Sequence, residues 1–179
     1  VFIKATVEFV DRSGTDQFIV GFRKNEAFTV PTSFLTGADA NYVDFAGIGF
    51  SGTASDLVKT MTDIGNSGST TVTNTGFAFA DNGIHTLETR IKGRSVSYYI
   101  NGALLGSLIS KDGEGTAITA QQTLSGASYT VTSGLFMVPF IFHRYDSTTP
   151  GAVYLHRLEV GQLLEVGLQN DMRGVQASS

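Results

Sequence analysis

The stretch GIHTLETRIKGRSVSYYINGALLG, residues 83–106, decides the fold. Leu87 and Ile91 share one face of its first half when the chain is extended. Glu88 and Arg90 alternate with them on the other face, which we expect to point toward water. This period of two is typical of a strand with one face buried. The second half repeats the alternation after a turn, so the stretch predicts two antiparallel strands.

The dipeptide Asn101-Gly102 closes the second of these strands. Both central residues of a type I′ turn need positive φ, so Asn-Gly between alternating segments is the strongest short-range hairpin signal. The strand before it directs Val96, Tyr98 and Ile100 inward. We therefore predict a type I′ turn with positive φ at Gly102.

Similar alternation recurs along most of the chain. Further apolar segments bounded by turn residues lie at 1–10, 17–24, 41–50, 56–65, 134–144 and 152–163. The first two predict an antiparallel hairpin, and Pro139 confines its own segment to a sheet edge or a bulge. Roughly ten short strands, with 21 glycines and no sustained helical period, predict an all-β fold, a two-sheet antiparallel β-sandwich of the jelly-roll kind.

One hydrophobic core should join the two predicted sheets. Its predicted members are Phe9, Phe22, Leu87, Ile91, Val96, Ile100, Phe140 and Leu158. Because no linker divides the chain, we expect residues 1–163 to form one β-sandwich domain and residues 164–179 to form a C-terminal arm or a short helix. The polar stretch 110–128 predicts a single exposed loop.

The composition narrows the classes of function. The 179 residues carry 12 basic and 16 acidic side chains in no long block, which argues against direct binding of nucleic acid. No apolar run approaches the length of a membrane span, and the absence of cysteine excludes disulfides and thiolate chemistry. Charged residues are only 16% of the chain, against about 25% in an average soluble domain. Either a neutral surface covered by a partner or a flat Ser/Thr surface accounts for this deficit.

The hairpin at 83–102 resembles the pattern G-x-W-H-T-L-x-v…g-x-v-x-f-y-v-D-G of concanavalin A-like sandwiches of the laminin G and pentraxin type, which include lectins and glucanases. Here Ile84-His85 stands where that hairpin often has tryptophan. Together with NYVDFAGIGFSG, MVPFIFHR and VYLHRLEVGQL, the hairpin also resembles proteins of tailed bacteriophages that carry a lectin-like domain on or near the capsid. The resemblance extends from about Val1 to Leu163. It implies a concanavalin A-like fold and a place on the virion.

Isolated carboxylates argue against a glycosidase. The resemblance implies that a glucanase of this fold would carry its carboxylates on one strand as E-x-D-x-(x)-E, and a retaining enzyme holds its pair about 5 Å apart. No such run occurs in this sequence. The scattered candidates are Glu8, Asp44, Glu88 and Glu159, each expected on solvated surface. We predict that the protein is not an enzyme and needs no cofactor.

Candidate metal ligands are sparse. Oxygen ligands for Ca²⁺ would come from Asp39, Asn41, Asp44, Asp112 and Glu114. Turn capping by Asp and Asn explains Asp39, Asn41 and Asp112 more simply. His85, His143 and His156 lack the spacing of a zinc site, although neighbouring strands could bring them together. We expect no metal site and three strand histidines with ordinary hydrogen-bond partners.

Exposed tyrosines are the candidate glycan platform. Carbohydrate modules stack sugar rings on flat aromatic side chains, and this chain has no tryptophan. Tyr99 should point outward while Tyr98 points inward, and Tyr129 and Tyr145 fall in predicted loops. An outward tyrosine more often packs across strands. Carbohydrate binding, which would attach a virion or an enzyme to a polysaccharide, is therefore the alternative function.

The function predicted first is that of a non-enzymatic virion structural protein, a bacteriophage capsid decoration or cement protein assembled in the host cytoplasm. Its expected partner is a capsid protein or further copies of itself, as a trimer or as a monomer clamped onto capsid subunits, and not nucleic acid or a membrane. The predicted partner-binding arm carries the apolar residues Leu164, Val166, Leu168, Met172 and Val175. The alternative is that this segment folds back on its own sandwich as a short helix.

Overall fold

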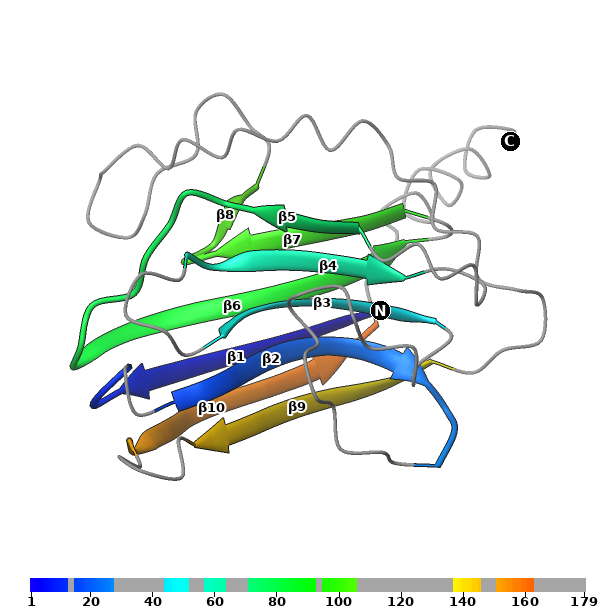
Figure 1. Cartoon of the computed structure of the whole chain (residues 1–179). Helices are drawn as coiled ribbons and strands as arrows, with labels where there is room; N and C mark the ends of the chain where they lie inside the picture. Colours follow the sequence, from blue (N-terminus) through cyan, green and yellow to red (C-terminus); the bar gives the residue numbers. More distant parts are fainter. Residues whose placement is uncertain are drawn as a thin grey trace, which may run out of the picture.

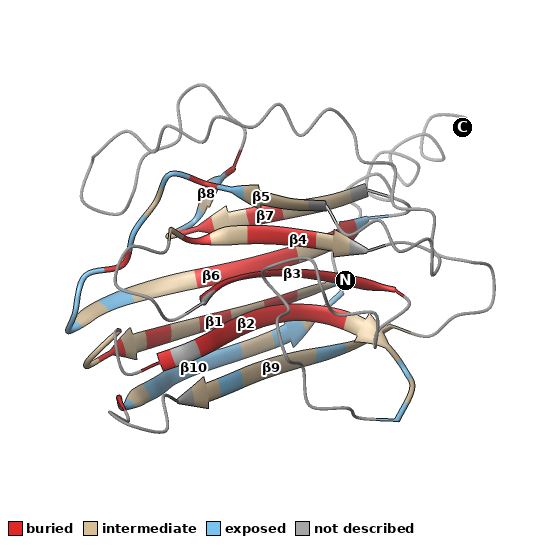
Figure 2. Ribbon diagram, viewed as in Figure 1, coloured by how far each residue is buried: buried red, intermediate tan, exposed pale blue. Residues whose placement is uncertain are grey.

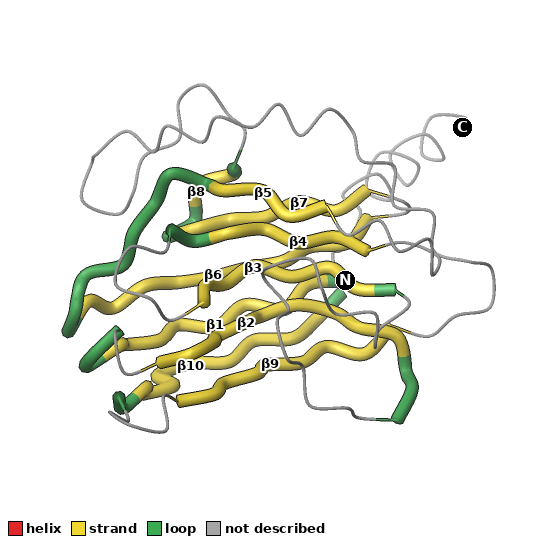
Figure 3. Tube along the Cα trace, viewed as in Figure 1, coloured by secondary structure: helices red, strands yellow, loops and turns green. Residues whose placement is uncertain are grey.

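A computed structural model describes eight parts of the chain: residues 1–12, 15–27, 44–51, 57–63, 71–92, 95–105, 137–145 and 151–162. These parts contain ten strands and no helix (Figure 3). The strands are β1 (Phe2–Phe9), β2 (Thr15–Lys24), β3 (Phe45–Ser51), β4 (Lys59–Asp63), β5 (Thr71–Asn74), β6 (Gly83–Lys92), β7 (Ser95–Ile100), β8 (Ala103–Leu104), β9 (Met137–Tyr145) and β10 (Val153–Gly161).

The strands form two five-stranded sheets (Figure 1). The first sheet has the order β10-β1-β6-β7-β8 and the second has the order β5-β4-β3-β2-β9. Every neighbouring pair in both sheets is antiparallel. The predicted fold class, a two-sheet antiparallel β-sandwich, is therefore confirmed. Nothing in these strands tests the proposed boundary at residue 163, and the predicted arm lies outside the described residues.

Strand β1 shows most clearly how the sequence builds this fold. Its residues alternate strictly between half-buried and buried, and Ile3, Ala5, Val7 and Phe9 are at most 1% exposed. The prediction that β1 and β2 form a hairpin is wrong, because β1 pairs with β10 and β6 while β2 pairs with β3 and β9. The chain crosses from one sheet to the other between these two strands, since both have an apolar face that the same core can cover.

The core between the sheets is centred on the fully buried ring of Phe9. This ring lies 5.1 Å from that of Phe18, 4.8 Å from that of Phe50 and 5.2 Å from that of Phe79, measured between centroids. Figure 2 shows the buried residues running along the middle strands of both layers. Five of the predicted members belong to this core, namely Phe9, Phe22, Leu87, Ile91 and Ile100, and Val96 packs against it half-buried.

Phe140 and Leu158 are not members of the shared core. In β9, Ile141 lies opposite Val20 and faces the core, so its neighbour Phe140 points to the other face of the second sheet. There Phe140 packs against Phe45, with ring centroids 5.4 Å apart, in a second apolar cluster. Leu158 is 48% exposed because β10 is an edge strand that, among the described strands, pairs only with β1. Pro139 lies on the other sheet's edge strand, as predicted.

The second apolar cluster also explains a glycine in the middle of β3. Phe45, Ile19 and Met61 are buried on the outer side of the second sheet. A Cβ atom at Gly47 would lie 2.7 Å from the ring of Phe45 and 3.0 Å from Cγ2 of Ile19. The ring of Phe45 and the side chain of Ile19 therefore leave no room for a larger residue at this position.

Two polar contacts cross the core and tie the sheets together. The Tyr98 hydroxyl on β7 donates to the carbonyl oxygen of Met61 on β4 at 2.9 Å and lies 2.7 Å from the Thr62 hydroxyl. The Thr89 hydroxyl on β6 donates to the carbonyl oxygen of Val20 on β2 at 3.0 Å. Complete burial raises the pKa of Tyr98, because the phenolate would lose its hydration. The side chain is thus held neutral as a hydrogen-bond donor inside the sandwich.

The predicted turn between β7 and β8 is confirmed. Asn101 has φ of 50° and Gly102 has φ of 80°, as a type I′ turn requires, and Ile100 pairs with Ala103 across it. The Asn101 side-chain oxygen also accepts a hydrogen bond of 2.9 Å from the Thr86 backbone amide. This bond fixes the turn to the neighbouring strand β6.

We predict that Phe9→Ala lowers the free energy of unfolding by about 3–5 kcal/mol, because it removes the ring at the centre of the aromatic core and leaves a cavity. Chemical denaturation followed by circular dichroism measures this loss. The control is Ile84→Ala, at a side chain 58% exposed on β6, which should change the free energy by less than about 0.5 kcal/mol. Equal effects for the two variants would contradict the core described here.

We predict that Gly102→Val lowers the free energy of unfolding by about 1–2 kcal/mol, the cost of a left-handed conformation for a residue with a Cβ atom. Nothing lies within 4 Å of a Cβ atom built at this position, so the backbone alone causes the loss. Gly102→Asn is the matched control and should cost less, because asparagine tolerates this conformation. A melting temperature unchanged by valine would rule out the type I′ turn.

Candidate functional site

The outer side of the first sheet carries a connected group of polar side chains. We call it the outer polar face, and its members are Lys4, Thr6, Glu8, Thr86, Glu88, Arg90, Tyr99, His156, Arg157 and Glu159. The strand register arranges part of it in a row: Glu159 and Glu88 lie opposite Lys4 on its two sides, and Tyr99 lies opposite Glu88. Strands β10, β1, β6 and β7 each contribute one residue to this row.

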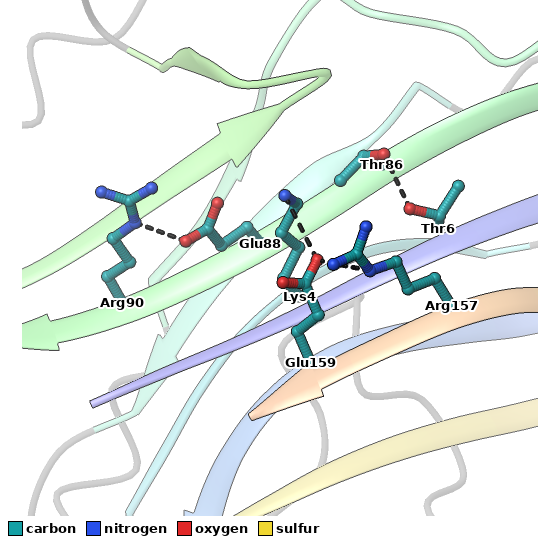
Figure 4. Close-up of polar contacts among 7 residues, drawn as sticks. All are labelled: Lys4, Thr6, Thr86, Glu88, Arg90, Arg157 and Glu159. Atoms are coloured by element: carbon teal, nitrogen blue, oxygen red, sulfur yellow. Dashed lines mark hydrogen bonds and ion pairs between the residues drawn. The ribbon is translucent and has the colours of Figure 1, made fainter. Parts of the chain in front are cut away.

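Ion pairs and hydrogen bonds connect the outer polar face (Figure 4). The Glu159 carboxylate accepts from Lys4 Nζ at 3.4 Å and from Arg157 Nε at 3.1 Å. The hydroxyls of Thr6 and Thr86 lie 3.0 Å apart and join β1 to β6. Polar residues alternate with buried apolar residues along each of these strands. Because the apolar residues face the core, the polar residues face the outer side and meet there.

Glu88 is buried, contrary to the prediction that it lies on solvated surface. Its side chain is only 5% exposed and pairs with the guanidinium of Arg90. The hydrogen bond that Arg90 donates to the Glu88 carboxylate raises the pKa of Arg90 above its usual value, because it favours the charged guanidinium. Arg90 also lies over the ring of Tyr99, with Cζ 4.0 Å from the ring centroid. The sequence could not show this burial, since it depends on side chains from three strands.

Asp44 is the second carboxylate that the sequence placed wrongly on the surface. It is fully buried directly before β3, and its carbonyl oxygen accepts a hydrogen bond of 2.9 Å from the Lys24 amide. Its place between the inner strands of the second sheet accounts for the burial. Glu8, by contrast, lies on the outer polar face, where its carboxylate is 2.9 Å from Nε2 of His156.

The four carboxylates are not arranged as a catalytic pair on one strand. Glu8, Glu88 and Glu159 belong to β1, β6 and β10, and each has a basic side chain as partner. Glu88 and Glu159 are separated by the intervening strand β1, which places their backbones roughly 9–10 Å apart. Lys4 stands between them, so this arrangement balances charge across the sheet.

The three histidines lie on three different strands. His85 on β6 stacks on Phe79 at 4.4 Å between ring centroids, and its Nδ1 is 3.3 Å from Nδ2 of Asn101. His143 on β9 lies 6.4 Å from the Phe18 ring, and partial burial lowers its pKa. Among the described residues, no three His, Cys, Asp or Glu side chains are placed to hold a metal ion. Four of the five candidate Ca²⁺ ligands, Asp39, Asn41, Asp112 and Glu114, lie outside the described residues.

The candidate glycan platform is not assembled by the described residues. Tyr98 points into the core and Tyr99 onto the outer polar face, as predicted. The Arg90 guanidinium covers one face of the Tyr99 ring, where a sugar would otherwise stack. Tyr145 ends strand β9, not a loop, and its side chain is outside the described residues, as is the whole of Tyr129.

Strand β10 carries an exposed apolar surface that the sequence analysis missed. We call it the β10 strip, and its members are Leu155, Leu158 and Val160, exposed by 51%, 48% and 54%, which lie opposite the core-facing Val7, Ala5 and Ile3 of β1. Together with Tyr154, which lies opposite Glu8 on the other side of the sheet, they are four of the seven large apolar side chains found exposed in the described residues. Figure 2 shows β10 largely as exposed. The alternation of this segment indicated a buried face, but an edge position leaves that face open.

The predicted arm residues Leu164, Val166, Leu168, Met172 and Val175 lie outside the described residues. The strip ends at Val160, four residues before Leu164, so the two are close in the sequence. In the described parts of the chain, no helix is long and apolar enough to cross a membrane.

We predict that Arg90→Ala lowers the free energy of unfolding by about 1–3 kcal/mol, because it leaves the buried Glu88 carboxylate without its charged partner. Denaturant unfolding at neutral pH measures the change. The matched control is Lys24→Ala, which removes the cation of the half-exposed pair with Glu26, 3.9 Å long, and should cost about 0–1 kcal/mol. A loss no larger than the control's would show that Glu88 does not depend on Arg90.

Comparison with known proteins gives distant structural likenesses. A β-1,3-glucanase from Mycobacterium marinum aligns at 13% identity and a TM-score of 0.43, over 88% of this chain and 62% of its own. An uncharacterised protein from Mycobacterium paratuberculosis aligns at 8% identity and 0.45, over 88% of this chain and 68% of its own. An immunostimulatory antigen and pseudo β-1,3-glucanase of Mycobacterium tuberculosis aligns at 10% identity and 0.42, over 83% of this chain and 55% of its own.

The chain thus spans about three fifths of the length of the first of these glucanases. No protein-family model matches the sequence, and no curated protein matches it. These likenesses are too distant to transfer an activity to this chain.

Proposed function

We propose that this chain is a non-enzymatic structural protein that attaches to other protein subunits through the β10 strip, as a bacteriophage capsid decoration or cement protein attaches to its lattice. The observation that carries the proposal is the gathering of exposed apolar side chains on one edge strand. The place of action that follows is the virion, with assembly in the host cytoplasm.

The β10 strip supports binding to protein. Single exposed apolar side chains are ordinary on a soluble domain, but a contiguous group marks an interaction surface. Leu155, Leu158 and Val160 fall within six residues of one strand and lie on the same side of it. Their burial against a partner would remove apolar surface from water, which is the main favourable contribution to protein association.

The outer polar face supports a structural role over catalysis. Its carboxylates are each engaged by a lysine, arginine or histidine, whereas a glycosidase needs one carboxyl group as acid and another as nucleophile or base. The low share of charged residues, 16%, agrees with a chain that has part of its surface covered by protein. Carbohydrate binding is the competing function, and the guanidinium over Tyr99 disfavours it at this position.

The test is whether the chain is bound to the capsid of virus particles. Cryo-electron microscopy of virions from the native source should show a β-sandwich on the capsid surface. Purified protein should rebind particles that lack it, and Leu155→Ser with Leu158→Ser should weaken rebinding at least about tenfold, the effect of losing central apolar contacts. Ile84→Ser is the matched control, since this side chain is exposed outside the β10 strip, and it should bind normally.

Other outcomes would overturn the proposal. The proposal would be contradicted if native virions lack the chain. It would also be contradicted if the variant with both leucine changes rebinds particles as tightly as the wild type. Binding to a polysaccharide on a glycan array, lost in Tyr99→Ala, would establish the carbohydrate alternative. Hydrolysis of a β-glucan that disappears on changing Glu8, Asp44, Glu88 or Glu159 would show an enzyme. Truncation after residue 163 tests the arm separately, because it leaves the strip intact.

A further inference from the structure

Within the part of the chain that the structure describes, the four edge strands of the two sheets differ in how well they suit pairing with another strand. Strand β8 has two residues and β5 has four, and β9 contains Pro139, which has no amide hydrogen to donate. Short edges and edge prolines are common protections against pairing with another chain. Strand β10 has nine residues and no proline. It is therefore the edge best suited to accept a strand.

The two sides of β10 have different chemistry. Leu158 and Val160 lie opposite Ala5 and Ile3 of β1, whose side chains belong to the core, so they point to the apolar side. Arg157 and Glu159 lie in the outer polar face, where Figure 4 shows them side by side on this strand. The Arg157 side chain is 69% exposed. A strand added to this edge must therefore present apolar residues on one side and complementary charges on the other.

A second copy of β10 meets both conditions in one antiparallel register. With Leu158 opposite Leu158 of the other copy, Arg157 lies opposite Glu159 of the other copy. By symmetry, Glu159 lies opposite Arg157 of the other copy. Centring the pair on Arg157 or on Glu159 instead places like charges opposite each other, which destabilises an antiparallel pair. A shift that pairs Leu158 with a charged residue would bring the apolar side of one copy against the polar side of the other.

We propose that two copies of this chain pair β10 with β10 about a two-fold axis at Leu158, so that their first sheets join into one ten-stranded sheet. This inference rests on the proposed function, because it names the partner that the β10 strip binds. Leu158 of each copy then lies opposite Leu158 of the other, and the regular pairing covers Arg157 to Glu159, because Val160 would meet the bulge at His156. A self-complementary edge produces a two-fold dimer, since each copy uses the same surface, and not the trimer predicted from the sequence.

A bulge limits the length of this interface. The register between β1 and β10 shifts between Thr6 and Val7, where His156 is the extra residue of β10. Regular pairing with β1 therefore runs from Arg157 to Gly161. Because the regular segment is short, the charge pairs between Arg157 and Glu159 of the two copies should have a large share in setting the register.

The experiment uses charge exchange in the full chain. Sedimentation velocity of the wild type over a range of concentrations should show a monomer–dimer equilibrium. R157E gives β10 two carboxylates and E159R gives it two guanidinium groups, so each variant alone should dimerise at least about tenfold more weakly, a change of about 1.4 kcal/mol. A mixture of the two variants should recover the dimer, because each copy then meets the opposite charge. The matched control, Lys92→Glu, changes an exposed cation of another strand and should dimerise normally.

Cross-linking tests the position of the axis. The chain has no cysteine, so Leu158→Cys introduces a single thiol. Directly opposed residues of an antiparallel pair have Cα atoms about 4.5–5.5 Å apart, which a disulfide can span. Oxidation should therefore give a covalent dimer from Leu158→Cys and not from Ile84→Cys. Circular dichroism must show that each variant remains folded.

Several results would overturn the dimer, and they differ from failure of the proposed function. A monomer at all concentrations, a trimer, or single variants that dimerise like the wild type would each contradict it. A dimer found only after deleting residues 164–179 would show that this segment occupies the edge, which also contradicts it. If the wild type is monomeric and Leu158→Ser still abolishes particle binding, the strip binds a capsid subunit and only the dimer is wrong. A dimer that binds no particle would leave this inference standing and overturn the virion role.

Discussion

The contact of the Phe9 ring with three phenylalanines holds the two sheets in one relation to each other. Phe9 comes from the first sheet, Phe18 and Phe50 from the second, and Phe79 from the segment leading into β6. Edge-to-face and stacked arrangements of this kind add to the free energy of burial. A slip of β1 by one residue would replace this ring with the carboxylate of Glu8, which the core could not accommodate.

The outer polar face depends on the same register. When Phe9 and Val7 face the core, Lys4, Thr6 and Glu8 must face outward, where Lys4 meets Glu88 on one side and Glu159 on the other. The packing on the core side of the sheet therefore determines which charged side chains lie next to each other on the outer side. The apolar β10 strip has a different origin, since β10 continues the sheet to an edge where its inward face is not covered.

Local patterns in the sequence were sufficient to predict the strands and the turn. Strict alternation in β1 and the Asn101-Gly102 pair each have one good structural solution, and both were confirmed. Pairing between strands depends on distant residues, which is why the predicted β1–β2 hairpin was wrong. Phe140 was misplaced because β9 is apolar on both sides, so its alternation does not indicate which side faces the shared core.

The site was less predictable than the fold. Glu88 looked solvent-exposed because its neighbours in the sequence are polar, yet the ring of Tyr99 and the guanidinium of Arg90 surround it. Leu158 looked buried because alternation reports which side a residue faces and not whether another layer covers that side. The exposure of Tyr154 could not be predicted, because the sequence does not show which strand lies at the edge of the sheet.

The pairing of β1 with β10 has a consequence for the time course of folding. The first described strand pairs with the last, and β6 flanks β1 on its other side. During synthesis, one edge of β1 therefore stays without its partner until β10 has left the ribosome. Closing so large a loop costs entropy before the pairing is gained, and proteins dominated by such contacts fold in milliseconds to seconds. A nascent chain would pass through a stage in which the β1 edge is open to chaperones or to wrong partners.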